Sequence, residues 1–270
     1  MDNEALINLI RSGETSKDKL ARLLQSSGNL YAEEKLIQNS TYSDFNWDKF
    51  QEFYVNKYSE EPDRSELDKY INNFHLGKDG KVNIAGALLF GKNVQKLLPQ
   101  FFVSAVWFAG NDLADTVYRS SENITGTLHS QYRGAFDFIK TKINYVQGDR
   151  SFNSVGMPEI PLIVFQEMLV NALVHRDYFI NDSVKVFIFQ NRIEIKSPGK
   201  LPNSLTVDDM KIGIRKSRNS TICSLAYDLL EYRGIGSGVV RSLKAYPHIE
   251  LINNQSAEQF TVIIHRPKNI

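Results

Sequence analysis

The sequence predicts an α+β fold, because helical stretches are interspersed with pairs of strands that follow each other as hairpins. The apolar run over residues 160–174 is long enough for a buried helix. β-Branched residues alternate between 184 and 196 around a turn at Asn191, which is typical of a β-hairpin. Two further apolar stretches, 249–253 and 260–265, predict a closing pair of strands.

The N-terminal part is predicted to be helical and acidic. Apolar residues recur at helical spacing over 47–58, with Asn46 as a plausible cap, and a second helix is expected over 65–74. Acids outnumber bases between residues 31 and 70. The first 28 residues are too short to build a core of their own.

The remaining elements follow from composition and spacing. A proline near the start of a helix suits its first turn, so Met157-Pro158 is expected to lead into the central helix. The other predicted elements are an apolar piece at 82–90, a buried strand at 101–108, and helices at 127–146, 219–230 and 239–245.

Bulk properties exclude several classes of protein. The 270 residues carry a net charge of +1, which gives no overall electrostatic case for nucleic-acid or membrane binding. The single cysteine, Cys223, excludes an internal disulfide and is expected in the core rather than as a nucleophile. With neither a signal peptide nor an apolar stretch of about 18 residues, the chain is expected to be cytoplasmic and not to bind membranes.

A polar stripe marks the otherwise apolar central helix. Glu167, Asn171 and His175 are four residues apart and therefore lie on one helix face. The stripe indicates a ligand, a metal or a facing polar element, or else an edge of the helix that reaches water, and the two interpretations carry equal weight. For a metal, Mg²⁺ held by an Asn171 oxygen and shared with phosphates fits better than zinc.

Two other stretches have the composition of anion sites. Gly234, Gly236 and Gly238 precede a predicted helix, so their backbone N–H groups could approach phosphate oxygens, but an ordinary turn is the alternative. The basic residues between Arg215 and Arg218 are a second candidate, or a solvated surface loop.

A near-match to a phosphate-binding loop at residues 86–93 is set aside. Its last position is Asn93, which lacks the hydroxyl that holds Mg²⁺, and its interior is bulky and apolar. A buried element followed by a turn explains this stretch better.

Several segments together carry a family resemblance that runs from about residue 10 to the end. They are, in order, Ala85–Lys92, Glu167–Tyr178 with its His-Arg-Asp-Tyr ending, Arg192–Pro202 with Ser-Pro-Gly-Lys-Leu-Pro, Arg218-Asn219, and Glu231–Gly238. In this combination the chain resembles bacterial transcriptional regulators whose C-terminal part is a RecG-like, GHKL-type ATP-binding domain.

The resemblance implies a specific architecture. The fold would be a mixed β-sheet with helices packed on one face, a GHKL/Bergerat-like two-layer sandwich, preceded by a small helical linker. Residues 81–270 would form the ATP-binding domain and 29–80 the acidic helical linker. Residues 1–28 would be the tail of a missing N-terminal Schlafen-like, Alba-type DNA-binding domain, through which such proteins contact DNA.

The resemblance also implies roles for individual residues, with ATP and Mg²⁺ as cofactors. Glu167 would be the general base for the attacking water and Asn171 the Mg²⁺ ligand. The remaining nucleotide-binding candidates are His175, Arg176, Ser197, Gly199, Arg218, Asn219 and the lid glycines Gly234, Gly236 and Gly238.

One departure from the family pattern separates the functional hypotheses. GHKL proteins read adenine with Asp in an Asp-x-Gly-x-Gly loop, whereas Ser197 and Leu201 occupy two of those positions here. The first hypothesis is an ATP-binding regulatory domain, with hydrolysis left open. The alternative is a non-catalytic interaction or homo-oligomerisation module that kept the fold without the nucleotide.

Two further activities carry less weight. Direct DNA binding by residues 215–218 would weaken steeply with salt, and the near-zero net charge speaks against it. Helicase activity is not expected, because no motor phosphate loop and no second motor domain are found.

Overall fold

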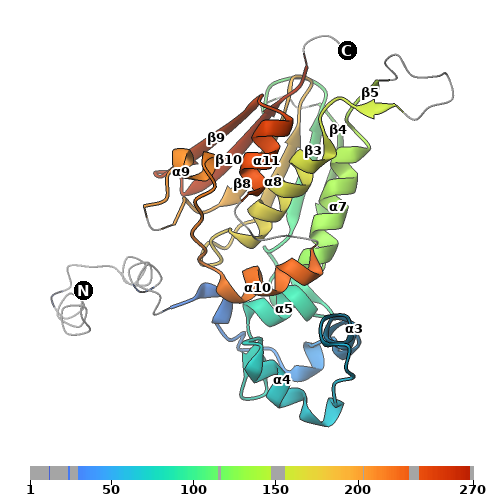
Figure 1. Cartoon of the computed structure of the whole chain (residues 1–270), viewed down its shortest axis with the longest axis vertical. Coiled ribbons are helices and arrows are strands. Elements are labelled where there is room, and N and C mark those ends of the chain that lie inside the picture. Colours follow the sequence, from blue (N-terminus) through green and yellow to red (C-terminus); the bar gives the residue numbers. More distant parts are fainter. Residues whose placement is uncertain are drawn as a thin grey trace.

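A six-stranded mixed sheet forms one layer of the structure (Figure 1). The computed structural model describes residues 30–114, 117–146, 156–202, 204–230 and 237–267, together with Ser12 and Leu24. The strand order is β4-β3-β7-β8-β10-β9, in which β3 and β7 are parallel and every other neighbouring pair is antiparallel. The strands are β3 (Val103–Phe108), β4 (Tyr118–Ile124), β7 (Val184–Ile188), β8 (Arg192–Pro198), β9 (Ile249–Asn254) and β10 (Gln259–His265).

Three helices cover one face of this sheet. They are α7 (Leu128–Lys140), α8 (Leu162–Val174) and α11 (Gly238–Ala245), and α8 packs between the other two (Figure 1). The predicted α+β class and its two-layer arrangement are therefore confirmed. α8 is buried along most of its length because nearly all its residues are apolar, so its few polar side chains need partners.

The start of α8 differs from the prediction. Met157 and Pro158 form the short strand β6, which pairs with β5 (Tyr145–Val146), and the helix begins at Leu162 after Pro161. The expectation that Pro158 occupies the first helical turn is wrong. The extended backbone that proline favours is used here in strand pairing, and a second proline immediately precedes the helix.

Alternation along β8 sorts its side chains between the two faces. Ile193, Ile195 and Ser197 are buried toward the helices. On the opposite face Glu194 forms ion pairs with Arg192 at 2.6 Å and with Lys196 at 2.8 Å. This alternation places the Ser197 hydroxyl next to α8.

An N-terminal helical unit, residues 30–97, packs around aromatic side chains, and the helices predicted at 47–58 and 65–74 are both present in it. The Phe50 ring lies 5.4 Å from that of Phe74 and 5.5 Å from that of Phe90. Asn46 caps the helix α3 (Trp47–Tyr58) by accepting a hydrogen bond from the backbone N–H of Lys49. The elements are η1 (Ala32–Glu34), η2 (Tyr42–Asp44), α3 (Trp47–Tyr58), η3 (Arg64–Glu66), α4 (Leu67–Asn73), β1 (Gly77–Lys78), β2 (Lys81–Val82), α5 (Ile84–Phe90) and α6 (Val94–Leu97).

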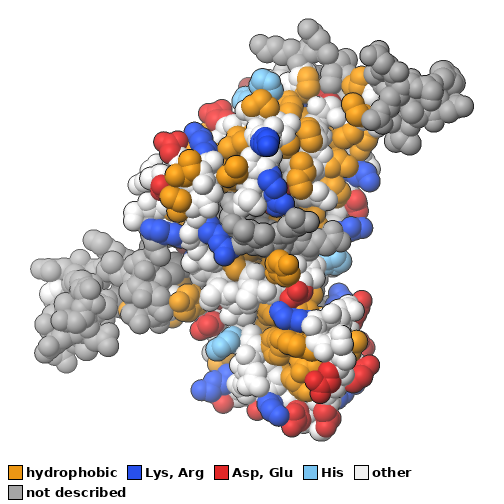
Figure 2. Space-filling model, viewed as in Figure 1, with side chains coloured by type: hydrophobic (Ala, Val, Ile, Leu, Met, Phe, Trp, Pro, Cys, Tyr) orange, Lys and Arg blue, Asp and Glu red, His pale blue; other side chains and the backbone are white. Residues whose placement is uncertain are grey.

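α10 (Ser220–Leu229) connects the helical unit to the sheet layer, because it packs against α3, α5 and α8 (Figure 1). Its first turn donates two backbone hydrogen bonds to the buried Glu33 carboxylate, from Thr221 at 2.8 Å and from Ile222 at 2.7 Å. Near its other end Asp228 pairs with Lys57 at 2.6 Å. Buried residues of both units form one continuous hydrophobic core, and acidic side chains gather at the outer end of the helical unit (Figure 2).

Candidate functional site

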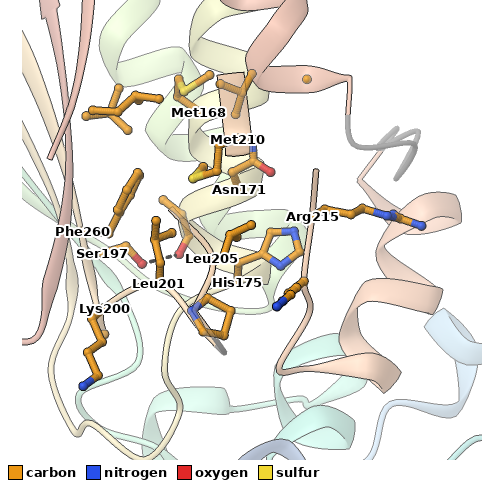
Figure 3. Close-up of a pocket in the computed structure, with 18 of the residues that line it drawn as sticks. Met168, Asn171, His175, Ser197, Lys200, Leu201, Leu205, Met210, Arg215 and Phe260 are labelled. Carbon is orange, nitrogen blue, oxygen red and sulfur yellow. Dashed lines mark hydrogen bonds between the residues drawn. The ribbon is translucent and has the colours of Figure 1, made fainter. Parts of the chain in front are cut away.

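A cleft lies between α8, the β8–β10–β9 side of the sheet and the segment that joins β8 to α10 (Figure 3). It has about 90 Å³ of cavity volume, or about 890 Å³ when the space open to solvent is included. Its lining includes Asn171 and His175 from α8, Ser197 from β8, and Gly238 from α11.

The cleft combines an apolar interior with a basic rim. Ile195, Val262, Phe260, Leu251 and Met168 supply apolar surface from the sheet and α8, and Leu201, Leu205 and Met210 supply it from the connecting segment. Lys200, Arg215 and Lys216 also line the cleft and are exposed. Such a site suits a ligand with a flat apolar part and an anionic part.

Glu167 and Asn171 lie one turn apart on α8, as their spacing predicts. The buried Glu167 carboxylate forms an ion pair with Arg241 of α11 through its Oε1 atom. Asn171 lines the cleft, whereas Glu167 is not among the described residues that do so. The polar stripe is therefore divided: Asn171 and His175 line the cleft, whereas Glu167 pairs with Arg241 instead.

Gly238 brings the start of α11 against these two residues. A Cβ atom at this position would lie 2.1 Å from Oε2 of Glu167 and 3.7 Å from the side-chain nitrogen of Asn171. Glycine is thus what allows this close approach. Of the three predicted lid glycines, Gly234 and Gly236 lie outside the described residues.

Ser197, the residue at the adenine-reading position of the resembling family, has a defined hydrogen-bonding role. Its Oγ donates to the backbone carbonyl of Ala172 in α8 at 2.9 Å. Because a hydroxyl has one hydrogen, the oxygen can then only accept a bond from a ligand. A base that presents an N–H group fits this position, as the exocyclic amino group of adenine does.

Gly199 holds the chain in a conformation that other residues rarely adopt. Its φ is +103°, and a Cβ would lie 2.5 Å from Cβ of Asp177. Its N–H donates to the carbonyl of Glu258 at 2.6 Å. Gly199 thereby sets the path of the chain into the cleft-lining segment.

The His-Arg-Asp-Tyr segment after α8 is held by contacts within the protein. The Arg176 guanidinium donates to the carbonyl of Ile180 at 3.0 Å and to that of Asp182, and it stacks over the Phe101 ring. The Tyr178 hydroxyl donates to the carbonyl of Leu173 at 2.8 Å. The structure places Arg176 in this turn and not among the described residues that line the cleft.

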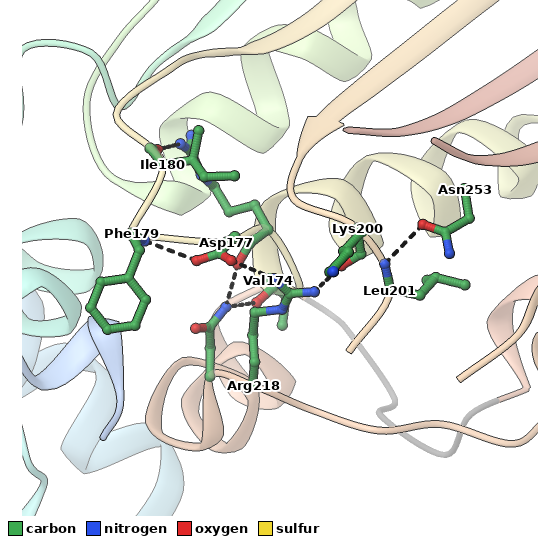
Figure 4. A network of polar contacts seen from close by, with 10 residues as sticks. Val174, Asp177, Phe179, Ile180, Lys200, Leu201, Arg218 and Asn253 are labelled. Atoms are coloured by element: carbon green, nitrogen blue, oxygen red, sulfur yellow. Dashed lines mark hydrogen bonds and ion pairs between the residues drawn. The ribbon is translucent and has the colours of Figure 1, made fainter. Parts of the chain in front are cut away.

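Arg218 and Asn219 tie the beginning of α10 to the end of α8, and Figure 4 shows the contacts of Arg218. Asn219 donates to the carbonyls of Val174 at 2.9 Å and Arg176 at 2.8 Å. Arg218 pairs with Asp177 at 2.8 Å and donates to the carbonyl of Lys200. Arg218 lines the cleft while making these contacts, whereas Asn219 is fully buried beneath it.

His175 lies at the cleft in its neutral form. Burial, with Arg218 and Arg215 nearby, lowers the pKa of His175 to about 4. Its Nδ1 atom is 3.8 Å from Sγ of Cys223. Burial raises the pKa of the Cys223 thiol to about 11, and its side chain packs against the core, so it is a protonated thiol rather than a nucleophile.

A cation at this cleft would depend on few protein ligands. Within the described ranges no cluster of three His, Cys, Asp or Glu side chains is placed to hold a metal ion. The Asn171 side chain offers an oxygen of the kind Mg²⁺ accepts, with the remaining ligands left to phosphates and water. The donor set therefore fits a Mg²⁺ ion that arrives with a phosphorylated ligand.

Two charged residues near the site were not predicted from the sequence. Arg241 pairs with Glu167, and Glu33 anchors the first turn of α10 directly after Asn219. Neither belongs to a motif, and each contact joins segments far apart in the chain. The spacing of Gly238 and Arg241, three residues apart, could at most have placed both on one helix face.

Comparisons with known proteins agree with part of the resemblance. Residues 181–264, which include β7, β8 and the site segments up to β10, match a protein-family model described as "Putative ATP-dependent DNA helicase recG C-terminal". This part of the chain is therefore similar to a RecG-like, ATPase-type domain. Glu167 and Asn171 lie outside the matched residues.

A solved structure shares the fold. The DIP2311 protein from Corynebacterium diphtheriae matches with a TM-score of 0.63 at 15% identity, over 95% of this chain and 51% of that protein. The chain thus spans about half the length of that structure. No curated protein matches the sequence. In the described part of the chain, no helix has the length and apolar character needed to cross a membrane. These comparisons show an α+β fold and, over residues 181–264, a similarity to a RecG-like, ATPase-type family model.

Proposed function

We propose that the cleft binds a purine nucleotide, with ATP and Mg²⁺ as the preferred pair. The observation that carries the proposal is the convergence of Asn171, Ser197 and Gly238 on one cleft with a basic rim. They come from three separate elements. Asn171 supplies an oxygen for a cation, Ser197 supplies a hydrogen-bond acceptor for a base, and Gly238 lets the backbone of α11 come close to α8. The match of residues 181–264 to an ATPase-type family model supports it independently.

The roles of the individual residues follow from their positions. Ser197 would accept from the base, and the apolar surface of Phe260 and Met168 would contact its ring. Lys200 and Arg215 would attract the phosphates, and Asn171 would hold Mg²⁺ against them. When bound, Mg²⁺ would neutralise part of the negative charge of the phosphates. Arg176 and Asn219 would act indirectly, by fixing the turn and the helix that position these groups.

The first hypothesis leaves hydrolysis open, whereas the alternative is an interaction or homo-oligomerisation module without the nucleotide. A general base must reach the attacking water, and Glu167 is the candidate carboxylate. Its ion pair with Arg241 and its absence from the described lining of the cleft favour, within the first hypothesis, a domain that binds nucleotide without turnover. With or without turnover, we propose a regulatory role, in which residues 81–270 form the nucleotide-binding unit and 29–80 the helical linker. DNA contacts would be made through a further domain.

Calorimetric titration of ATP and ADP with Mg²⁺ tests the binding proposal. Asn171→Ala should abolish or strongly weaken the Mg²⁺-dependent part of binding, whereas Asn123→Ala should not change it. Asn123 is a matched control, because it is an exposed asparagine on the edge strand β4. No binding at millimolar nucleotide, or equal effects of the two substitutions, would refute the proposed site.

A further inference from the structure

The candidate base is covered on both of its oxygens. Oε1 of Glu167 accepts from the Arg241 guanidinium, and Oε2 lies against the backbone of Gly238, where a Cβ would be 2.1 Å away. Glu167 is 9% exposed as a side chain, and Arg241 is 36% exposed. Held in this way, and absent from the described lining of the cleft, the carboxylate is poorly placed to take a proton from a water in the cleft.

Both contacts to the Glu167 carboxylate come from the helix α11. Gly238 and Arg241 are three residues apart and therefore lie on one face of α11, and this helix packs directly against α8. Gly238 also lines the cleft, so α11 forms one wall of the proposed nucleotide site while it covers Glu167. A shift of α11 relative to α8 would open the ion pair and expose the carboxylate together.

We propose that Arg241 is a latch that keeps Glu167 out of the reaction until α11 moves. This inference rests on the proposed nucleotide site and specifies its regulation. With the latch closed the site binds nucleotide with little turnover. With it open, Glu167 can accept the proton of the attacking water while that water bonds to the terminal phosphorus, the bond from this phosphorus to the bridging oxygen breaks, and ADP leaves. Arg241 acts through Glu167 and is a positioning residue.

Phosphate release from ATP with Arg241→Gln, Arg241→Lys and Lys244→Gln tests the latch. Lys244 is the matched control, because it is an exposed cation on the same helix and loses the same charge. Removing the guanidinium should raise kcat about two- to fivefold, the factor that a partly exposed ion pair supplies, with little change in KM. Arg241→Lys should retain the low rate, and Lys244→Gln should match the wild type.

A second substitution shows whether the gain passes through Glu167. In the Glu167→Gln background, Arg241→Gln should produce no increase, because the released group is absent. A kcat that falls in Arg241→Gln, or a gain that persists without Glu167, would overturn the latch. An unchanged rate in a variant with a wild-type melting temperature would also overturn it.

Amide hydrogen exchange separates the latch from the nucleotide proposal. Arg241→Gln should exchange faster than Lys244→Gln across Val239 to Ala245, with or without nucleotide. If neither the wild type nor any variant binds nucleotide, the proposed function fails. Faster exchange in Arg241→Gln than in Lys244→Gln would still show that the Arg241 contact holds α11. Equal exchange in the two variants would refute the latch itself.

Discussion

Asp177 and Arg218 form a buried ion pair of 2.8 Å that joins the turn after α8 to the start of α10. Their side chains are only 5% and 7% exposed, respectively. Arg218 donates as well to the carbonyl of Lys200, so one guanidinium connects three segments around the cleft. Arg218, which the resemblance assigns to nucleotide binding, therefore also has a structural role that does not depend on a nucleotide.

Arg218→Ala should lower the free energy of unfolding by about 3–5 kcal/mol, because it leaves the Asp177 carboxylate buried without its cation. Urea unfolding in the absence of nucleotide measures this loss. Lys211→Ala is the control, since its pair with Asp208 is exposed and should be worth at most about 1 kcal/mol. Similar losses in the two variants would mean that Arg218 contributes little to stability.

Gly199→Ala should be more destabilising than Gly80→Ala, although both glycines have positive φ. Gly80 has φ +78° and open space around its Cα, so alanine there meets only the conformational cost of about 1–2 kcal/mol. At Gly199 a Cβ would also clash with Asp177. The melting temperature of Gly199→Ala should therefore fall further than that of Gly80→Ala, and the difference measures the clash. Equal melting temperatures would show that the chain around Gly199 moves to relieve the clash.

The sequence predicted the fold well because its signals there are local. The apolar run of α8, the alternation in β7 and β8, and the cap at Asn46 each depend on neighbouring residues, and the structure has all three. The start of α8 was missed because the backbone around Pro158 pairs with a strand, and a partner strand cannot be read from local spacing.

The site was predicted only in part, because side-chain partners are set by tertiary packing. Spacing placed Glu167 and Asn171 on one face of a helix, and the structure confirms that geometry. It could not show that Arg241, 74 residues away, would cover Glu167. Nor could it show that Arg176 binds backbone carbonyls, because an arginine in a turn has the same sequence pattern when it binds a phosphate.

Glu33 should make stability depend on pH. Burial raises the pKa of Glu33 from 4.5 to about 7, against the backbone hydrogen bonds from Ile222 and Thr221. Between these values the folded protein retains a proton that the unfolded chain has lost. The stabilisation is therefore complete below about pH 4.5 and is lost as the pH rises toward 7, with a total on the order of 3 kcal/mol.

Denaturant unfolding of the wild type and Glu33→Gln between pH 5 and 8 measures this dependence as a difference. The comparison with the variant is needed because the lowered pKa of His175 has the opposite effect, stabilising the fold as the pH rises from about 4 to 6.5. Glu60→Gln, an exposed substitution on the helical unit, should follow the wild-type curve. A Glu33→Gln curve parallel to the wild type would show that Glu33 titrates normally.

Ser197→Ala should reduce discrimination between ATP and GTP at the proposed site. With its hydrogen donated to Ala172, the Ser197 oxygen can accept from an amino group but has nothing to donate to a carbonyl. Guanine has a carbonyl where adenine has its amino group, so we expect the wild type to favour ATP. Loss of that acceptor should weaken ATP binding by about 1 kcal/mol, roughly fivefold, and leave GTP binding nearly unchanged. Calorimetric titration of both nucleotides gives the two affinities. An equal loss for both would instead indicate that the substitution loosens the contact between β8 and α8, since the Ala172 carbonyl then also loses its partner.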